Sequence, residues 1–187
     1  MIKLLKLLEE IKTPYTIFCD LDGVLVDFDR GYKELTGKST KHQNSQNKDY
    51  FWKLFRDSLD EKGITEKQYW ENLEWMSDGK QLWDYISPYN PYILTAPAVN
   101  HDLPADLKYK LEHNESKQGK LEWVKRLPNM KKIYFKGSNF KQDLSKPNRI
   151  LIDDREPTIQ QWNVKGGIGI LHTSSNNTIK ELKKLGL

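Results

Sequence analysis

Five short apolar runs constrain the fold of this 187-residue chain more than any other feature of its sequence. They are YTIFC at 15–19, PYILT at 91–95, KKIYF at 131–135, RILID at 149–153 and GIGIL at 167–171. Most are apolar at nearly every position, which is typical of strands buried on both faces of a parallel sheet. Segments with helical character lie between the later runs, at 120–127 and 156–164, and another, at 176–185, closes the chain. This alternation predicts an α/β protein with a doubly wound parallel sheet.

A long interruption lies between the first and second runs. Residues 29–90 contain no convincing strand, yet they hold many aromatic side chains. A segment of this length is too long for an ordinary connection and too short to fold around a core of its own. We therefore expect a small helical cap at 29–90, inserted into a core that consists of residues 1–28 and 91–187.

Capping signals divide this expected cap into three helices. Asp49, Thr65 and Ser77 are good N-cap residues, and each precedes a segment with helical spacing of its apolar residues. Gly63 follows the first of these segments and suits the left-handed position after a helix. The polar, turn-rich segment at 36–49 is expected to be a loop inside the cap.

The composition is that of a soluble globular protein. No apolar run approaches the roughly 18 residues that a membrane span needs, and MIKLLKLLEEIK at 1–12 fits an amphipathic helix better than a signal peptide. Cys19 is the only cysteine, which excludes a disulfide framework and favours a cytoplasmic location. The net charge of +4 suits a small anionic ligand better than a polyanion.

The sequence DLDGVLVDF, which directly follows the first strand, allows two interpretations. Asp22-Gly23 between two apolar runs is a strong signal for a β-hairpin turn. Alternatively, Asp20 and Asp22 stand at the carboxyl end of a parallel strand, where open α/β sheets bind their ligands.

Other polar residues are expected at the same edge of the sheet. Thr95 ends the second run, Lys136 and Lys141 follow the third, and Asp153 and Asp154 end the fourth. Each has an ordinary explanation by itself, such as helix capping for the aspartates or solvation for the lysines. Their shared position at one sheet edge favours a site for a phosphorylated ligand.

These residues resemble the four motifs of the haloacid dehalogenase superfamily. DLDGVLVDF is similar to its first motif, ILTA to its second and ILIDD to its fourth, with a lysine between the last two. More closely, DLDGVLVDF, ILTAP, GKLEWVKR and LIDDRE resemble the 5′(3′)-deoxyribonucleotidase family, whose members carry a helical cap. The chain departs from that family after Pro97, between Phe135 and Lys141, and in most of the cap.

The resemblance implies a Mg²⁺-dependent phosphatase that forms an aspartyl-phosphate. Asp20 would be the nucleophile, and Asp22 would act as general acid and then as general base. Dehalogenases of the superfamily lack the second aspartate, so Asp22 favours phosphatase chemistry. Asp20, the backbone carbonyl of Asp22 and either Asp154 or Asp153 would hold the metal, because Mg²⁺ prefers oxygen ligands.

The same resemblance assigns a phosphate site. The Thr95 hydroxyl and the N–H groups at Ala96 would bind phosphate oxygens, and a lysine would neutralise the charge that develops on the phosphoryl group. Lys141 is the preferred lysine because it follows the third strand. Lys120, near the start of the helix at 120–127, is the second choice.

The expected partner is a small phosphorylated substrate, a (deoxy)nucleoside monophosphate in the first place. Phe28 and at least one of Phe51 and Trp52 would contact the nucleobase, although aromatic residues on a helix also form the core of a cap. Two alternatives stay open because a fold does not fix a function. One is a phosphatase for sugar phosphates or polynucleotide ends, and the other is a non-catalytic nucleic-acid-binding protein. A membrane partner is not expected, nucleic acid is disfavoured, and a homodimer stays open.

Overall fold

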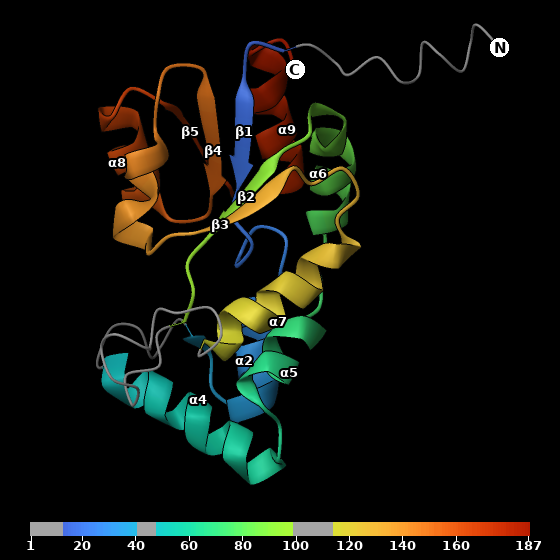
Figure 1. Cartoon of the computed structure of the whole chain (residues 1–187), viewed down its shortest axis with the longest axis vertical. Helices are drawn as coiled ribbons and strands as arrows, with labels where there is room; N and C mark the ends of the chain where they lie inside the picture. Colours follow the sequence, from blue (N-terminus) through green and yellow to red (C-terminus); the bar gives the residue numbers. More distant parts are fainter. Residues whose placement is uncertain (1–12, 41–47, 99–113) are drawn as a thin grey trace, which may run out of the picture.

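A computed structural model describes residues 13–40, 48–98 and 114–187 of the chain. Figure 1 shows a sheet with helices on both faces, and a second group of helices beyond the ends of the strands. The amphipathic helix expected at 1–12 lies outside the described residues, as does most of the loop expected at 36–49. In the described ranges, no helix combines the length and the apolar character needed to cross a bilayer.

Five parallel strands form one sheet in the order β3-β2-β1-β4-β5. Their bounds are β1 Thr16–Cys19, β2 Tyr92–Thr95, β3 Lys132–Phe135, β4 Arg149–Asp153 and β5 Ile168–Leu171. All five end at the residue predicted from the sequence, and four begin one residue later. The predicted doubly wound parallel sheet is therefore confirmed.

The strands are apolar throughout because the sheet is buried on both faces. Phe18, Leu94 and Leu151 pack on one face with Trp162 of α8 (Glu156–Val164). Residues one position along the strands, such as Ile17 and Ile93, point to the other face and join the larger core cluster. That cluster includes residues of α6 (Gly79–Ile86) and α9 (Ser175–Lys184). Side chains alternate across the sheet in this way because successive strand residues face opposite sides.

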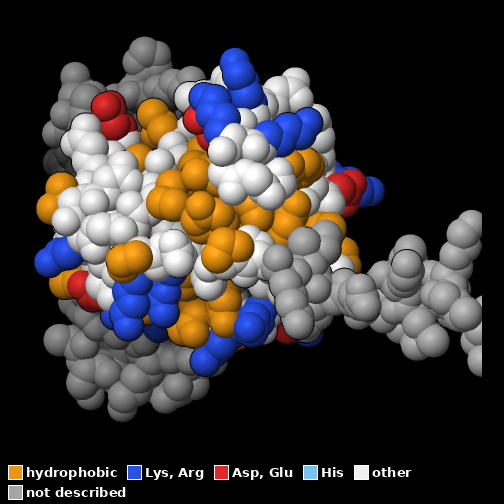
Figure 2. Space-filling model, turned by 90° about the horizontal axis from the view of Figure 1, so that it is seen from above, with side chains coloured by type: hydrophobic (Ala, Val, Ile, Leu, Met, Phe, Trp, Pro, Cys, Tyr) orange, Lys and Arg blue, Asp and Glu red, His pale blue; other side chains and the backbone are white. Residues whose placement is uncertain are grey.

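Figure 2 shows the end of the molecule opposite the carboxyl edge of the sheet, and the side chains on this surface differ in type from those at the carboxyl edge. Hydrophobic side chains gather on it, with lysine and arginine side chains beside them and few carboxylates. The aspartates of the motifs are collected at the carboxyl edge instead.

The helices of the later half of the chain agree with the sequence, with one difference. α8 matches its predicted range and has Pro157 in its first turn. α7 (Glu115–Trp123) begins five residues earlier than the predicted helix at 120–127, and the 3₁₀ turn η4 (Val124–Arg126) follows it directly. A second 3₁₀ turn, η5 (Ser138–Leu144), follows β3. Asn114 caps α7 by accepting a hydrogen bond from the N–H of Lys117 at 3.0 Å.

Gly119 explains how α7 approaches its neighbour. A Cβ atom at Gly119 would lie 2.5 Å from the carbonyl oxygen of Lys67, which belongs to α5 (Glu66–Asn72). The missing side chain therefore permits close packing of α7 on α5, and this packing carries Lys120 to the edge of the sheet.

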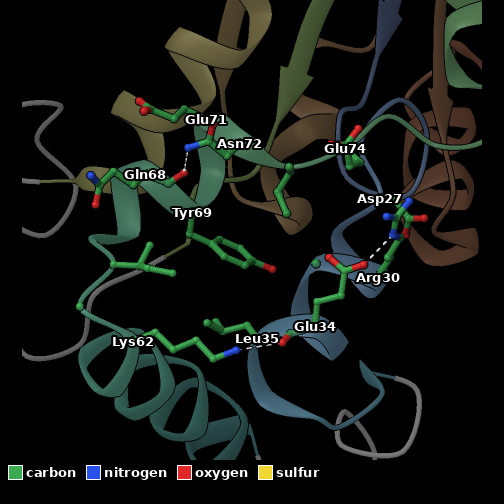
Figure 3. A pocket seen from close by; sticks show the side chains of 14 residues that line it. Asp27, Arg30, Glu34, Leu35, Lys62, Gln68, Tyr69, Glu71, Asn72 and Glu74 are labelled. Carbon is green, nitrogen blue, oxygen red and sulfur yellow. Dashed lines mark hydrogen bonds and ion pairs between the residues drawn. The ribbon is translucent and has the colours of Figure 1, made fainter.

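Beyond the carboxyl edge of the sheet lie α2 (Phe28–Thr36), α4 (Lys48–Lys62) and α5, with α7 packed on α5. A cavity lies between α2, α4 and α5 (Figure 3). The sequence did not predict α2, which begins after the N-cap Asp27, whose carboxylate accepts from the N–H of Arg30. The predicted N-cap Thr65 is confirmed at the start of α5, where it forms a capping box with Gln68.

Two predicted caps are wrong. α4 begins at Lys48, so Asp49 lies inside the helix rather than before it. The residue before α6 is Asp78, not Ser77, and its side chain makes no capping bond. Asp78 instead accepts a hydrogen bond from the N–H of Ser175 at 2.6 Å, which joins α6 to the start of α9.

The helix α6 falls within the predicted cap range of 29–90, and it packs on α9 beside the sheet. Its short connection to β2 contains the 3₁₀ turn η2 (Ser87–Tyr89). The division of the chain into a core and a cap at 29–90 stays a prediction, with α2, α4 and α5 as the helices that lie over the strand ends.

Candidate active site

The chain turns sharply after β1 instead of returning as a hairpin strand. The N–H of Gly23 donates to the carbonyl of Val26 at 2.9 Å, and α2 begins two residues later. Both neighbours of β1 in the sheet are parallel strands, β2 and β4. The hairpin interpretation of Asp22-Gly23 is therefore wrong, and the turn leaves Asp20 and Asp22 at the carboxyl edge of the sheet.

Gly23 is required by this arrangement. Its φ of 77° lies in the left-handed region, and a Cβ atom there would approach Oδ2 of Asp154 to 2.3 Å. The missing side chain thus lets the carboxylate of Asp154 lie directly against the turn that carries Asp20 and Asp22.

Asp20 is paired with Lys141. Asp20 Oδ1 accepts from the N–H of Leu21 at 2.8 Å, and Asp20 Oδ2 lies 2.7 Å from Lys141 Nζ. The Lys141 ammonium is 1% exposed and also lies 2.7 Å from Asp153 Oδ2. Burial opposes the charge of Lys141, but the two carboxylates outweigh it and raise the pKa of the ammonium. Lys141 therefore stays a cation between two buried aspartates.

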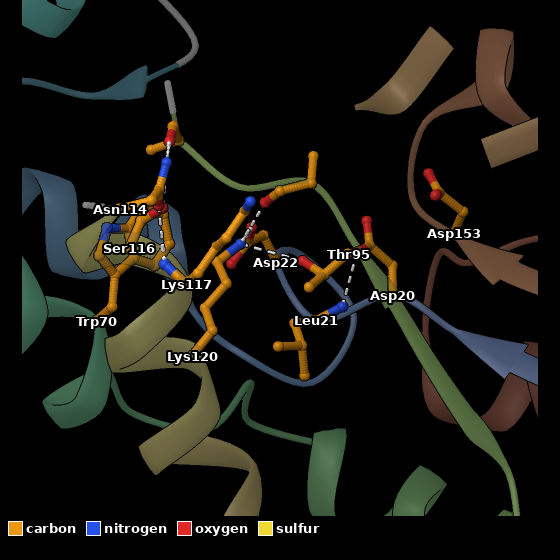
Figure 4. A network of polar contacts seen from close by, with 12 residues as sticks. Asp20, Leu21, Asp22, Trp70, Thr95, Asn114, Ser116, Lys117, Lys120 and Asp153 are labelled. Atoms are coloured by element: carbon orange, nitrogen blue, oxygen red, sulfur yellow. Dashed lines mark hydrogen bonds and ion pairs between the residues drawn. The ribbon is translucent and has the colours of Figure 1, made fainter. Parts of the chain in front are cut away.

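Asp22 is paired with the second candidate lysine (Figure 4). Lys120 Nζ, on a side chain that is 2% exposed, forms an ion pair with Asp22 Oδ2 and donates to Thr95 Oγ1 at 3.0 Å and to the Ala96 carbonyl at 2.8 Å. It also lies 4.4 Å from the centre of the Trp70 ring. The structure brings both lysines to the site, where each forms an ion pair with a different aspartate of the first motif.

One carboxylate oxygen of Asp22 is not used by the ion pair with Lys120. Its Oδ1 is buried and has no hydrogen-bond partner among the described residues. Burial raises the pKa of Asp22 above its usual range, although Lys120 acts against this rise. A carboxyl group with a raised pKa and a free oxygen is suited to proton transfer.

Three carboxylates gather where a metal ion was expected. Asp20, Asp153 and Asp154 each offer an oxygen, and these oxygens all lie within 4.8 Å of one another. Burial, with Asp20 next, raises the pKa of Asp154 to about 7. A divalent cation with oxygen ligands would relieve this repulsion, so the residues present fit Mg²⁺.

The two adjacent aspartates have different surroundings. Asp153 is fully buried, and its carboxylate is used by Lys141 and by the N–H of Arg155 at 3.0 Å. Burial and the neighbouring Asp20 raise the pKa of Asp153 to about 6. Asp154 is exposed and lines the open cavity above Asp20. This difference favours Asp154 as the metal ligand and Asp153 as the residue that holds Lys141.

Cys19 lies directly beneath the site. It is the last residue of β1, is fully buried, and donates from Sγ to the carbonyl of Asp20 at 3.3 Å. Burial raises the pKa of its thiol well above the usual range, and the charge of Asp20 adds to this rise. The thiol therefore remains protonated and serves as part of the core.

A cavity of about 560 Å³ opens over these residues, between the sheet edge and residues of α2, α4 and α5. Phe28 and Trp52 line it, as expected for contacts with a substrate. Phe51 does not line it; the side chain is 3% exposed and stacks on Tyr32 with ring centres 4.3 Å apart. Phe51 therefore packs in the interior between α4 and α2.

Sequence reasoning missed several residues of this cavity. They are Asp29, Thr40, Trp70, Ser138 and Arg155. Trp70 stacks on Phe28 with ring centres 5.0 Å apart and planes inclined by 4°. Two signals were available: Arg155 directly follows the aspartate pair, and Trp70 lies on the helix that the Thr65 capping box begins.

Comparison with known proteins supports the fold described above. No protein-family model matches the chain, and no curated protein matches it. A haloacid dehalogenase-like hydrolase of Streptococcus pneumoniae is similar in structure, with a TM-score of 0.52, 16% identity, and coverage of 90% of this chain and 91% of that one. The haloacid dehalogenase-type hydrolase YfnB of Bacillus subtilis, bound to magnesium, has a TM-score of 0.51 and 13% identity, over 86% and 87% of the chains. The chain thus has the α/β fold of haloacid dehalogenase-like hydrolases.

Proposed function

We propose that this protein is a Mg²⁺-dependent phosphatase that hydrolyses phosphate monoesters through an aspartyl-phosphate. One observation carries the proposal. Asp20 and Asp22 follow the same strand, and each is paired with its own buried lysine, Lys141 for the first and Lys120 for the second. This arrangement separates a charged nucleophile from a carboxyl group that can exchange protons.

Asp20 is the nucleophile in this proposal. One of its carboxylate oxygens attacks phosphorus, the new O–P bond forms, and the bond from phosphorus to the leaving oxygen breaks. The hydrogen bond from the N–H of Leu21 and the ion pair with Lys141 fix the direction of the carboxylate. Lys141 also offsets part of the negative charge that gathers around the phosphoryl group.

Asp22 moves the protons in both halves of the reaction. In its protonated form it gives a proton to the leaving oxygen, so the product departs as an alcohol. The resulting carboxylate then takes a proton from water, which attacks the phosphorus of the acyl-phosphate. Cleavage of that O–P bond restores the Asp20 carboxylate and releases inorganic phosphate. The raised pKa of Asp22 supports the first of these roles.

Thr95, the N–H groups at Ala96 and Lys141 form the proposed phosphate site, with Lys120 as the second candidate lysine. Thr95 Oγ1 already accepts a hydrogen bond from Lys120, so its hydroxyl hydrogen is available for a phosphate oxygen. Asp20 and Asp154, two of the three clustered carboxylates, would hold Mg²⁺, together with the carbonyl of Asp22 that the family resemblance implies. When bound, the ion supplies positive charge that stabilises the phosphoryl oxygens.

A (deoxy)nucleoside monophosphate is the proposed substrate, which makes the protein a 5′(3′)-deoxyribonucleotidase-like enzyme. Phe28 and Trp52 line the cavity beside the phosphate site and offer aromatic surface to a base. A sugar phosphate is the second candidate. It is favoured by the polar pair of Asp29 and Thr40 in the same cavity, which are hydrogen-bonded to each other and could bind sugar hydroxyls.

Two measurements test this proposal in sequence. The first is hydrolysis of para-nitrophenyl phosphate with and without Mg²⁺, with Asp20→Asn as the inactive control, because an amide cannot attack phosphorus. Activity of folded Asp20→Asn at the wild-type level would overturn the mechanism. The second compares kcat/KM for nucleoside monophosphates, ribose 5-phosphate and glycerol phosphate. Equal values would reject the nucleotidase substrate and leave the phosphatase chemistry in place.

A further inference from the structure

A second cavity, of about 600 Å³, lies inside the cap between α2, the end of α4, and α5 (Figure 3). Its volume falls in the range typical of small-molecule sites, about 300–1,000 Å³. None of the three clustered aspartates, Asp20, Asp153 or Asp154, lines it, nor do Asp22, Lys120 or Lys141. It is therefore separate from the active-site cavity, with α2 as the shared wall.

Tyr69 gives this cavity an unfilled polar position. The residue is 8% exposed, lines the cavity, and its hydroxyl has no hydrogen-bond partner among the described residues. The hydroxyl lies against Gly31, where a Cβ atom would come within 3.1 Å of it. An unpaired buried hydroxyl is costly, so a ligand that hydrogen-bonds to Tyr69 would gain from this group.

Charge around the cavity selects the type of ligand. Four carboxylate residues line it, Asp27, Glu34, Glu71 and Glu74, against two cationic residues, Arg30 and Lys62. Both cations are already paired with Glu34. Arg30 Nε lies 2.8 Å from the Glu34 carboxylate, and Lys62 Nζ donates to the Glu34 carbonyl at 3.0 Å. Of the other carboxylates, Asp27 accepts from the N–H of Arg30 and Glu71 lies 3.9 Å from Lys67 Nζ. The four carboxylates therefore exceed these three cationic side chains by one negative charge, and the wall is acidic.

Apolar side chains form the rest of the wall. Leu35 and Leu73 are buried there, and Ile64 is 37% exposed although it is a large hydrophobic residue. Exposed apolar surface beside acidic groups fits a molecule with both an apolar body and a positive charge. We infer that the cap cavity is a second binding site, and that its ligand is a small organic cation such as a protonated alkylamine.

The aromatic contacts around Tyr69 provide a signal for binding. Its ring meets that of Trp70 edge-on, with ring centres 5.5 Å apart, and it meets Phe28 edge-on at 6.3 Å. Phe28 also lines the active-site cavity. A ligand on the Tyr69 hydroxyl should therefore change the tryptophan fluorescence of the cap.

The test is titration of the full chain with n-hexylamine, followed by calorimetry and by tryptophan fluorescence. Hexanoate and hexanol are the matched probes without the positive charge. We expect saturable binding of one hexylamine per chain and much weaker binding of the other two. Equal binding of hexanoate, or no saturable binding of hexylamine, would overturn the inference.

Variants assign the binding to this cavity. Tyr69→Phe keeps the ring and removes one hydrogen bond, so it should weaken hexylamine binding between about twofold and tenfold. Glu74→Gln removes an exposed charge of the wall, should also weaken binding, and serves if Tyr69→Phe does not fold. Glu181→Gln, on the distant helix α9, is the control and should bind like the wild type. Unchanged affinity in both cavity variants would place the amine elsewhere and refute the site.

Discussion

Lys141 Nζ lies 2.7 Å from Asp20 Oδ2, and both side chains are almost fully removed from solvent. The same ammonium lies 2.7 Å from Asp153 Oδ2, so one buried cation holds two aspartates that belong to neighbouring strands. The 3₁₀ turn η5 after β3 thus brings Lys141 to Asp20, while α7 brings Lys120 to Asp22.

Replacement of Lys141 by Ala should lower kcat/KM on the order of 10²–10³-fold, because the charge on the phosphoryl group is no longer offset. Lys120→Ala, measured under the same conditions, shows how much each lysine contributes to kcat/KM. Lys136→Ala is the control, because the Lys136 ammonium is paired with the exposed Asp143 rather than with a motif aspartate. Lys141→Ala also leaves two buried carboxylates without their cation, which costs about 3–5 kcal/mol of stability. Rates must therefore be normalised to the folded fraction. A loss confined to Lys120→Ala would transfer the phosphate role to that lysine.

Asp22→Asn should lower kcat by about 10²–10⁴-fold with little change in KM, because the amide cannot give or take the proton. Steady-state kinetics on a nucleotide and on para-nitrophenyl phosphate measure the effect. An ester with a better leaving group needs less protonation, so the loss should be smaller on para-nitrophenyl phosphate. A change in KM alone would contradict the acid–base role.

Asp154→Asn should raise the Mg²⁺ concentration required for half-maximal activity by at least about tenfold, because one charged oxygen ligand is lost. Asp153→Asn should act mainly on stability, since its carboxylate pairs with Lys141 inside the core. Activity as a function of Mg²⁺, and thermal unfolding with and without the ion, separate the two. The reverse pattern would exchange the roles of these aspartates.

Trp52→Ala should reduce kcat/KM for nucleoside monophosphates by roughly 5- to 150-fold, the range that corresponds to the loss of one stacking contact of 1–3 kcal/mol. Turnover of ribose 5-phosphate should change little in the same variant. Phe140→Ala is a suitable control, because Phe140 is 61% exposed and does not line the cavity. An equal loss on both substrates would indicate that Trp52 only supports the cap.

His172 should make the free energy of unfolding fall as the pH falls. Burial lowers the pKa of its imidazole below 6.5, with Asp78 acting weakly against this, and Nδ1 lies 2.8 Å from Thr178 Oγ1. The unfolded chain therefore takes up the proton first, so this stability is present above pH 6.5 and is lost as the pH falls through the lower pKa of the folded state.

Urea unfolding between about pH 7.5 and pH 5 measures this dependence, with His172→Gln as the non-titrating comparison. The wild type should lose stability relative to the variant toward the acid end. Parallel curves for the two proteins would show that His172 does not titrate in this range.

Much of the fold was predictable because the apolar runs at 15–19 and 149–153 have the pattern of doubly buried strands. The ends of all five strands follow from such runs. The helix α2 was missed because it begins inside the first motif, where Asp27 is both a motif residue and an N-cap. Because α2 was not predicted, the sequence could not distinguish Phe51, which Tyr32 of that helix covers, from Trp52, which lines the cavity.

The candidate site was predictable only as a set of residue types at one edge of the sheet. Lys120 and Lys141 come from different elements, and their distances to Asp20 and Asp22 depend on how α7 and the loop after β3 fold back. The sequence alone could not show which lysine pairs with which aspartate. The cavity of the cap depends in the same way on the packing of α2 against α5.

The position of Cys19 has a practical consequence. It is the single thiol in 187 residues, and it stays protonated and out of reach while the sheet is closed. A thiol reagent can modify it only when the central strand separates from its neighbours, so the labelling rate measures how often that opening occurs. The wild-type chain thus carries its own reporter of local unfolding, one residue away from the nucleophile.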